Sequence, residues 1–471
     1  MTKKYAIVCV FIFFACRSSA QQYGLFNTKT LFDSFENPAQ KSFVLDSSRQ
    51  FASNFLLPNF GLNAANKGDA TYTVRKLIDE GVYTSTTLPL GPGKYNTVYQ
   101  NANIYLFTFK IFQSYKFNKE LGFSWQVRTD ARVDYTNETL ALLDSYKRFN
   151  TGIAYNDVFN DRGFAQSYHQ FSINYRENYT KRLSFGVKLS LLSGITTNNL
   201  KVDNSSLYID PATEQVILGL KGSYKASFLE SNEINKNTFF PTFKNPGFSI
   251  SLGTSYTSKR GVTIMGNLKD LGIIKWSKRS HIVNFNTTEL ISQIGDGTLT
   301  PSSPDQDVYN IIRDSDKQNS FYTLTNAKAD FLISKPFNFY VPGLILSKNL
   351  FYKGGDIAFV NTLKYNEFSG SLIPTYNLNG FLMAGIQGMY KTPNFEVFIG
   401  SDNLTKSIAL AKDVATSTGY NGASFYMGMS IKFGYVVNHP LNSSYIPGLE
   451  NDSDQSFFKR MFNAINIFKR K

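Results

Sequence analysis

Cysteine is nearly absent from this sequence, and it occurs only in the predicted signal peptide. The 471 residues include two cysteines, Cys9 and Cys16. Both precede the predicted mature chain, which can therefore form no disulfide and no cysteine metal site. None of the three histidines stands in an HExxH spacing, and the sequence has no phosphate-binding loop, dinucleotide fingerprint or G-x-S-x-G elbow. We therefore expect no enzymatic activity, no metal and no cofactor.

Long hydrophobic runs are missing as well. Beyond the N-terminus no uncharged apolar stretch reaches about 18 residues, which excludes membrane-spanning helices. At the N-terminus a basic start precedes a shorter apolar run at residues 5–15 and a small-residue segment ending at Ala20. This pattern predicts a signal peptide, residues 1–20, cleaved between Ala20 and Gln21. A lipoprotein signal acylated at Cys16 is the alternative.

Export and composition together indicate a bacterial envelope protein. The chain has 28 tyrosines and 42 phenylalanines but two tryptophans, which suits a large antiparallel β-protein with aromatic girdles. The net charge is +14, or about +11 without the three basic residues of the signal. The basic residues are scattered, so they indicate either ordinary surface charge or attraction to anionic lipid. Nucleic acid is not expected as a partner of an exported chain.

The stretch at residues 121–135, LGFSWQVRTDARVDY, alternates strictly between apolar and polar positions. Successive side chains of a strand point to opposite faces, so this segment has one apolar and one polar wall. A soluble sheet shows such alternation with its polar face in water. A membrane barrel shows it with the polar face turned to a lumen. The predicted signal peptide and many similar segments favour the barrel.

Fourteen segments are predicted as strands, with 12 to 16 as the range. They lie at residues 51–57, 103–117, 121–135, 170–176, 183–191, 216–224, 248–256, 262–268, 321–333, 356–365, 370–376, 381–390, 395–401 and 423–437. A short helix follows residue 136, and residues 281–320 are predicted to form a polar loop. The fold class is therefore all-β, an antiparallel transmembrane β-barrel. Its domains are a plug-like segment (21–50), the barrel (51–437) and a periplasmic tail (438–471).

One polar face carries an unusual series of charges. Gln126, Arg128, Asp130, Arg132 and Asp134 follow one another on the lumen-facing side of the predicted strand. The functional interpretation is a polar ladder that lines or gates a passage. The structural interpretation, which we favour, is an ion-pair network that fills the barrel interior.

The C-terminal tail has its own charge pattern. Residues 457–471, FFKRMFNAINIFKRK, place apolar side chains on one helical face beside Lys459, Arg460, Lys469, Arg470 and Lys471. Such a helix can lie on an anionic membrane surface. It can equally pack on the barrel mouth or fray.

Several blocks carry a resemblance to a known family. They are QYGLFNTKTLFDSFENPAQKSF, ELGFSWQVRTDARVDYTNET, SYHQFSINYRENY, GNLKDLGIIKW, ILSKNLFYKGGDIAFVN and GASFYMGMSIKFG. They resemble an uncharacterised outer-membrane β-barrel family of the Bacteroidota. The sequence Asn37-Pro38-Ala39 is also similar to the hatch motif of long-chain fatty-acid transporter-like barrels. The resemblance implies a 14-stranded barrel with a plug, although the long tail departs from barrels that end on a strand.

Two functions fit these features. The first is a monomeric outer-membrane barrel that passes or binds hydrophobic small molecules, with outer-membrane lipid around it. The second is a structural or accessory barrel that docks periplasmic or secretion-machinery proteins, with the basic tail as its contact.

Overall fold

The computed structural model describes residues 22–43, 49–79, 85–91, 93–113, 119–213, 215–293, 309–310, 312–411, 419–436 and Phe458. Its strands are β1 (Arg49–Ser53), β2 (Asn59–Lys67), β3 (Tyr95–Gln113), β4 (Lys119–Thr136), β5 (Tyr155–Asn156), β6 (Arg162–Asn178), β7 (Leu183–Ile209), β8 (Gln215–Ala226), β9 (Pro246–Thr257), β10 (Thr263–Lys275), β11 (His281–Gln293), β12 (Asp316–Gln318), β13 (Tyr322–Leu324), β14 (Lys328–Ser334), β15 (Tyr340–Asn349), β16 (Gly355–Tyr365), β17 (Phe368–Asn377), β18 (Phe381–Lys391), β19 (Phe395–Ser401) and β20 (Tyr420–Val436). The helices are α2 (Leu31–Glu36), α3 (Thr71–Asp79), α4 (Asn137–Asp144) and α6 (Leu404–Ala411), with short 3₁₀ turns at Tyr23–Leu25, Tyr146–Arg148, Ser231–Glu233 and Lys236–Phe239.

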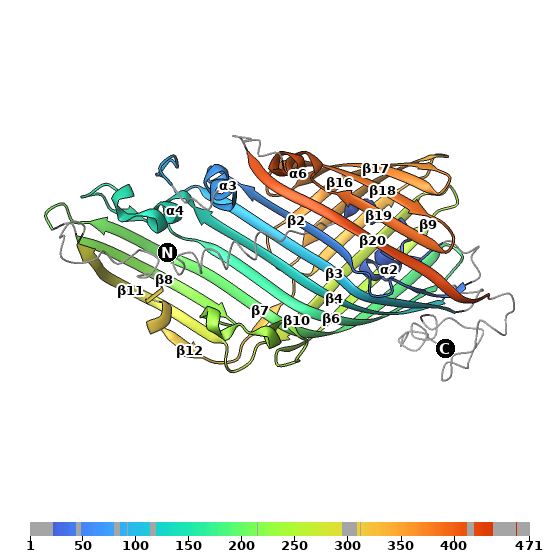
Figure 1. The fold of residues 1–471 in the computed structure, drawn as a ribbon, viewed down its shortest axis with the longest axis horizontal. Coiled ribbons are helices and arrows are strands. Elements are labelled where there is room, and N and C mark those ends of the chain that lie inside the picture. The colour runs from blue at the N-terminus through green and yellow to red at the C-terminus, as the bar shows by residue number, and fades with distance from the viewer. Residues whose placement is uncertain are drawn as a thin grey trace, which may run out of the picture.

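The strands close into an antiparallel barrel with fourteen wall positions in the described part of the chain (Figure 1). Around the ring these are β1/β2, β3, β4, β6, β7, β9, β10, β13/β14, β15, β16, β17, β18, β19 and β20. The first wall strand is β1 and β2 together, because both pair with β20 on one side and β3 on the other. That pairing joins the last wall strand to the first and closes the sheet. The predicted fold class and strand number are confirmed.

The first wall strand is interrupted between β1 and β2. Asn54 is buried there, and its side chain takes over the missing ladder bonds. Its Oδ1 accepts from the Thr108 N–H at 2.8 Å, and its Nδ2 donates to the Leu57 carbonyl at 2.9 Å. The next residues, Phe55 and Leu56, have positive φ and are exposed.

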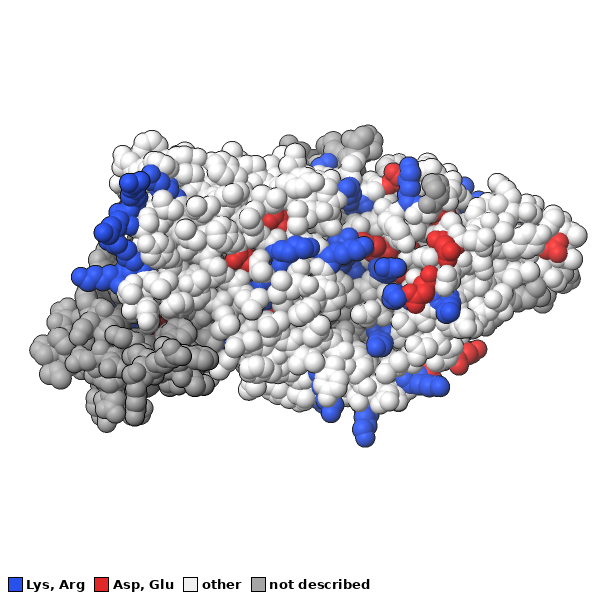
Figure 2. Space-filling model, turned by 180° about the vertical axis from the view of Figure 1, so that it is seen from behind, with Lys and Arg blue, Asp and Glu red and all other residues white. Residues whose placement is uncertain are grey.

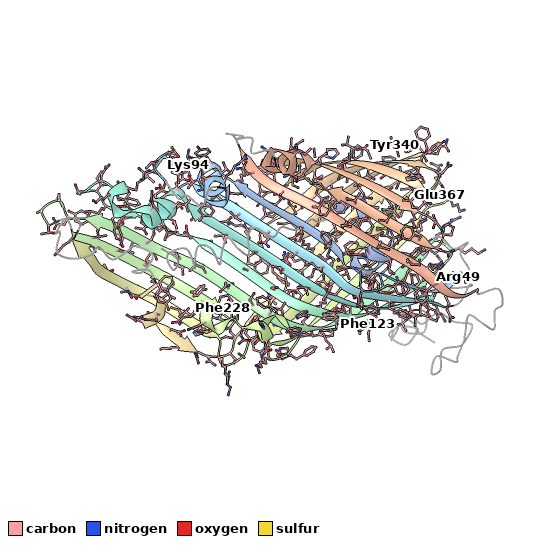
Figure 3. The ribbon with its side chains drawn as sticks, in the orientation of Figure 1. Arg49, Lys94, Phe123, Phe228, Tyr340 and Glu367 are labelled. Carbon is pink, nitrogen blue, oxygen red and sulfur yellow. The ribbon has the colours of Figure 1, made fainter. Side chains whose placement is uncertain are left out.

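The two ends of the barrel differ. Consecutive strands are joined by short turns at one end, where β1 begins and β20 ends. The other end has the long loops with α3, α4 and α6, together with the short β15–β16 and β17–β18 links, and we call it the long-loop end. Figure 3 labels Arg49 and Glu367 at the short-turn end and Lys94 at the long-loop end. In outer-membrane barrels short turns face the periplasm. No helix among the described residues is long and apolar enough to cross a membrane.

Strand β7 is long enough to serve two sheets. Its first half pairs with β9 in the barrel wall, and its second half pairs with β8, which continues to β11 and β12 as a projecting sheet. The segment around α4 covers one face of this sheet, where Leu142 and Phe159 pack with Leu207, Leu218 and Phe285. The predicted loop at residues 281–320 is therefore wrong in part, because β11 completes this second core. Residues 294–308 and 311 lie outside the described part.

The segment at residues 22–43 lies inside the barrel, and its hydrogen bonds run from Asp402 beside α6 to Lys391 at the short-turn end. All six residues of α2 are buried. Its apolar side chains, among them Phe32 and Phe35, pack against lumen-facing Tyr105, Phe398 and Tyr426 of the wall. We call this segment the plug.

Candidate functional site

The plug is seated at its tightest point against two glycines of the wall. Gly186 of β7 and Gly253 of β9 are direct register partners. A Cβ on Gly253 would lie 2.5 Å from Asn37 Oδ1 and 2.8 Å from the backbone nitrogen of Ala39, which is closer than atoms pack. The two missing side chains thus form a niche for the Asn37-Pro38-Ala39 turn.

Polar bonds hold the same turn. Asn37 Oδ1 accepts from the Ala39 N–H at 3.0 Å, which fixes the turn internally. The Ala39 carbonyl accepts from Arg176 Nε at 2.9 Å and from the Ser184 hydroxyl at 3.1 Å. The hatch-like motif predicted from the sequence is therefore a docked turn whose partners belong to β6 and β7.

Glu36, at the end of α2, is the charged centre of the lumen. Its carboxylate pairs with Lys269 of β10 and lies 3.4 Å from Arg128 Nη2 of β4. The Tyr105 hydroxyl donates to it at 2.7 Å and the Asn103 amide at 2.5 Å. A buried charge is tolerable only with such partners, so Glu36 ties the plug to three wall strands.

A bulge in β10 supplies the second carboxylate. The β9–β10 register shifts between Leu268 and Leu271, so that Lys269 and Asp270 are both buried towards the lumen. Asp270 pairs with Arg128 and lies 3.0 Å from the Lys188 ammonium of β7. A bulge inserts one extra residue and re-aims a side chain, and here it brings both signs of charge together.

The predicted ladder on β4 has two parts: Gln126 and Arg128 belong to the buried network around the plug, and Asp130, Arg132 and Asp134 lie closer to the long-loop end. Gln126 and Arg128 are buried, with Gln126 bonded to Gln170 and Arg128 to Glu36 and Asp270. Asp130 Oδ1 accepts from the amides of Asn101 at 3.1 Å and Asn326 at 2.9 Å. Arg132 and Asp134 pair with each other at 2.8 Å, nearer the long-loop end.

Further bonds attach the plug around the ring. The Tyr23 hydroxyl donates to Asp356 of β16 at 2.6 Å, and the Leu31 N–H donates to Glu396 of β19 at 2.6 Å. The Asn174 amide of β6 donates to the Ser34 carbonyl at 2.6 Å. Beside the plug lies a cavity of about 30 Å³, room for one or two water molecules, lined by Arg128, Asp130, Lys269 and Lys328 among others.

The wall is incomplete where β19 ends. β19 pairs with β18 only over Ile386–Lys391 and with β20 only over Tyr426–Ile431, and the chain then turns into α6. Helix α6 contacts both β18 and β20. Ser407 of α6 stands in for the missing strand, since its hydroxyl accepts from the Ser424 N–H at 2.9 Å. We call this part of the wall, closed by a helix instead of a strand, the α6 window.

Behind the α6 window lies an apolar cluster. Phe381 and Met383 of β18, Tyr420 of β20 and Ala65 of β2 are buried together, with Tyr99 packed against them. The Phe381 and Tyr420 rings are 4.3 Å apart. On the outside, Leu382, Ile408 and Phe425 are exposed. Apolar side chains therefore line both sides of the window.

The plug touches the window directly. The Gln22 N–H donates to Asp402 Oδ2 at 2.9 Å, and Asp402 is the link between β19 and α6. The start of the plug and the base of the helix thus share a buried hydrogen bond.

Sequence reasoning missed several of these residues. Glu36, Lys188, Lys269 and Asp270 were not singled out, although the adjacent charges Lys269-Asp270 break the alternation of their strand and so signal a bulge. The predicted cleavage residues Ala20 and Gln21, and the tail residues Lys459, Arg460, Lys469, Arg470 and Lys471, lie outside the described part. Within the described residues no three His, Cys, Asp or Glu side chains are grouped to hold a metal ion.

Comparisons with known proteins place the sequence in a family and find distant structures. Residues 45–402 match a family of unknown function, DUF5723. A Pseudomonas aeruginosa FadL homologue shares 11% identity over 88% of this chain and 96% of its own, with a TM-score of 0.44. The Ralstonia pickettii toluene transporter TbuX shares 8% over 85% and 93%, with a TM-score of 0.40. No curated protein matches the sequence.

Proposed function

The chain belongs to the DUF5723 family of unknown function, and we propose that it is an outer-membrane β-barrel that passes or binds hydrophobic small molecules. The observation that carries the proposal is the α6 window. A wall made only of paired strands offers an apolar solute no exit to the side. Here a helix of eight residues closes the wall, with the apolar cluster of Phe381 and Tyr420 behind it.

The plug inside the lumen limits how a solute can pass through the barrel. The plug occupies the lumen beside a cavity of about 30 Å³, and we expect it to block a straight path for solutes larger than water. Passage therefore requires the plug or α6 to move. The predicted polar ladder then has a structural role. Arg128 secures the plug through Glu36 and Asp270, while the apolar route runs along β18–β20.

An engineered disulfide tests the window. The mature chain has no cysteine, so the variant Ser407→Cys with Ser424→Cys contains one possible disulfide, which would lock α6 to β20. The matched control is Thr362→Cys with Ser371→Cys. These two side chains lie 2.9 Å apart across β16 and β17, which are already paired.

Uptake is measured in cells that express the full chain, with toluene, oleate and a sterol as probes of increasing size. We expect at least one probe to enter in a protein-dependent way, at a rate that falls about tenfold when the window variant is oxidised and recovers with reductant. The control disulfide should leave uptake unchanged. Protein-independent uptake of all three probes, or full uptake by the oxidised window variant, would contradict the proposal. Heat-modifiable gel mobility of membrane-extracted protein checks the barrel itself.

A second function, an accessory barrel that docks periplasmic proteins, is favoured by the closed lumen and by one residue of the tail. Phe458 is buried against Tyr175 and Phe185 at the short-turn end. Deletion of residues 457–471 separates the two functions. If uptake persists while a bound periplasmic protein is lost, the accessory function is the correct one.

A further inference from the structure

The short-turn end of the barrel is strongly basic along half of its circumference. Positive charge lies on three consecutive hairpin turns, joining β6 to β7, β9 to β10 and β14 to β15, and at the end of β16 beside a fourth, the β16–β17 turn. We call these residues the basic arc; they are Lys181, Arg182, Lys259, Arg260, Lys335 and Lys364. All six are exposed. Figure 2 shows basic side chains gathered at this end of the face that it views.

The arc has almost no charge compensation. None of its six residues forms an ion pair with another described residue, and Glu367 is the one exposed acidic residue on these four turns. The long-loop end behaves differently. There Lys201 pairs with Asp203 at 2.5 Å and Lys353 lies 3.8 Å from Asp134. Uncompensated like charge in one layer costs free energy unless a partner of opposite sign is close by.

Exposed aromatic side chains accompany the charges. Phe337 and Phe339 lie on the β14–β15 turn, and Tyr365 and Phe368 flank the β16–β17 turn. The Lys335 ammonium lies 4.9 Å from the centre of the Phe337 ring. Tyr365 is 78% exposed, and a tyrosine ring suits a boundary at which one end is apolar and the other is wet. Rings next to lysines at the end of an apolar wall are suited to the boundary between lipid tails and headgroups.

From this arrangement we infer that the basic arc binds the headgroups of anionic phospholipids in the leaflet that surrounds the short-turn end. The inference rests on the proposal that the barrel spans a membrane, but not on transport. Phospholipid is the occupant that explains both features, since its phosphates meet the lysines and arginines while its glycerol and upper tails meet the rings.

The position of Phe458 is an independent observation in the same layer. Its N–H donates to Glu177 at 2.8 Å, and its ring lies 6.0 Å from that of Tyr175 and 5.8 Å from that of Phe185. Tyr175 lies on the outer face of β6, because its neighbour Arg176 points inward to the plug. The chain thus returns to the outer wall beside the β6–β7 turn. Lys459 and Arg460 follow directly in the sequence.

The test uses the full mature chain in mixed detergent micelles that contain equal amounts of phosphatidylglycerol and phosphatidylcholine. After removal of free micelles, the lipid retained per protein is measured by mass spectrometry. In the arc variant all six residues are replaced by glutamine. The matched control replaces six exposed lysines outside the arc by glutamine: Lys94, Lys221, Lys225, Lys236, Lys244 and Lys278. Heat-modifiable mobility of each variant shows that the barrel is folded, whatever the result for transport.

We expect the wild type and the control variant to retain phosphatidylglycerol about threefold over phosphatidylcholine. The arc variant should retain both equally, and about 1 M salt should abolish the preference of the wild type, because screening acts on exposed charge. Equal retention by the wild type, or a preference that survives in the arc variant, overturns the inference. Binding of an acidic periplasmic protein that depends on the arc, without lipid preference, would also overturn it.

Discussion

Replacing Gly253 with alanine tests whether the plug is held by its fit to the wall. The new methyl group would lie 2.5 Å from Asn37 Oδ1 and 2.8 Å from the Ala39 nitrogen. Because one of these atoms belongs to the backbone, no side-chain rotation relieves the clash. Overpacking of this kind costs about 1–3 kcal/mol. The strand itself loses nothing, so the cost falls on the seated plug.

A free-energy change of that size raises the unseated fraction of the plug by about 5- to 150-fold. The absence of cysteine from residues 21–471 makes this fraction measurable. A Ser34→Cys probe, buried in the seated plug, should react with a maleimide faster by that factor when Gly253→Ala is added. Conductance across planar bilayers should rise with it. Gly186→Ala, on the other side of the niche, should behave alike.

The control is Gly388→Ala in β18, where a Cβ would have no described heavy atom within 4 Å. It matches the test substitution in chemistry and secondary structure, and we expect wild-type labelling and conductance. If Gly253→Ala labels no faster than Gly388→Ala, the plug is not seated by contact with the glycine pair. Equal acceleration by both substitutions would point instead to a general weakening of the sheet.

Three further predictions follow from buried polar groups. Glu36→Gln leaves the Lys269 ammonium without its carboxylate, so it should loosen the plug by about 3–5 kcal/mol, whereas adding Lys269→Met should recover most of the loss in a double-mutant cycle. Burial raises the pKa of Asp161, beside α4, from 3.8 to about 7. The folded state therefore favours the protonated Asp161 carboxyl. This preference contributes at most about 4 kcal/mol to the unfolding free energy. The contribution is complete below pH 4 and is lost as the pH rises through 7. The thermal midpoint of the wild type should fall between pH 5 and pH 8 by more than that of Asp161→Asn, and parallel curves would refute the assignment. Asn54→Ala should lower the unfolding free energy by about 1–3 kcal/mol, measured in urea, because the Thr108 N–H loses its acceptor.

The sequence predicts the barrel wall well where a strand has one apolar face and one polar face. Residues 121–135 lie within β4, and the odd-numbered Phe123 is exposed while Ser124 and Gln126 are buried. The short helix after residue 136 is also confirmed, since the Thr136 hydroxyl caps α4 by accepting from the Thr139 N–H. These features depend on local periodicity and capping, which a single sequence displays.

The strand number is correct, although two errors compensate. The predicted strand at residues 216–224 is β8, which belongs to the projecting sheet. It alternates because one face packs on the core around α4. Strand β15 was missed, since Pro342 and Gly343 interrupt its pattern. Proline destabilises a strand because it has no N–H to donate to the ladder, and it is tolerated at positions where the ladder requires no such bond. Alternation reports a half-buried strand but not which sheet the strand joins.

The plug contacts were beyond sequence reasoning for a different reason. Glu36 meets Lys269 across 233 residues of chain, and Gly253 meets Asn37 across a similar separation. Neither member of such a pair looks unusual in its own segment. Only the closure of the barrel brings them together. The bulge at Lys269-Asp270 is the exception, because two adjacent charges in an alternating strand place a local mark on the sequence.

The hydrogen bond between Gln22 and Asp402 connects the two features on which the proposed function depends. The plug is held by ion pairs to β4, β7 and β10, while α6 closes the wall between β18 and β20 and is joined to β20 by the Ser407–Ser424 hydrogen bond. Asp402 belongs to the second closure and binds the start of the first. Displacement of Gln22 would leave the Asp402 carboxylate without this donor at the base of α6, a cost that movement of α6 towards solvent relieves.

Asp402→Asn keeps an acceptor for Gln22 and should leave the window closed. Asp402→Leu removes the acceptor and should free the two closures from each other. Maleimide labelling of Ser34→Cys in the plug and of Ser407→Cys in α6 measures each closure separately. Loosening the plug with Gly253→Ala should speed labelling at residue 407 in the wild-type and Asp402→Asn backgrounds but not with Asp402→Leu. Equal acceleration in all three backgrounds would show that the plug and the window open independently.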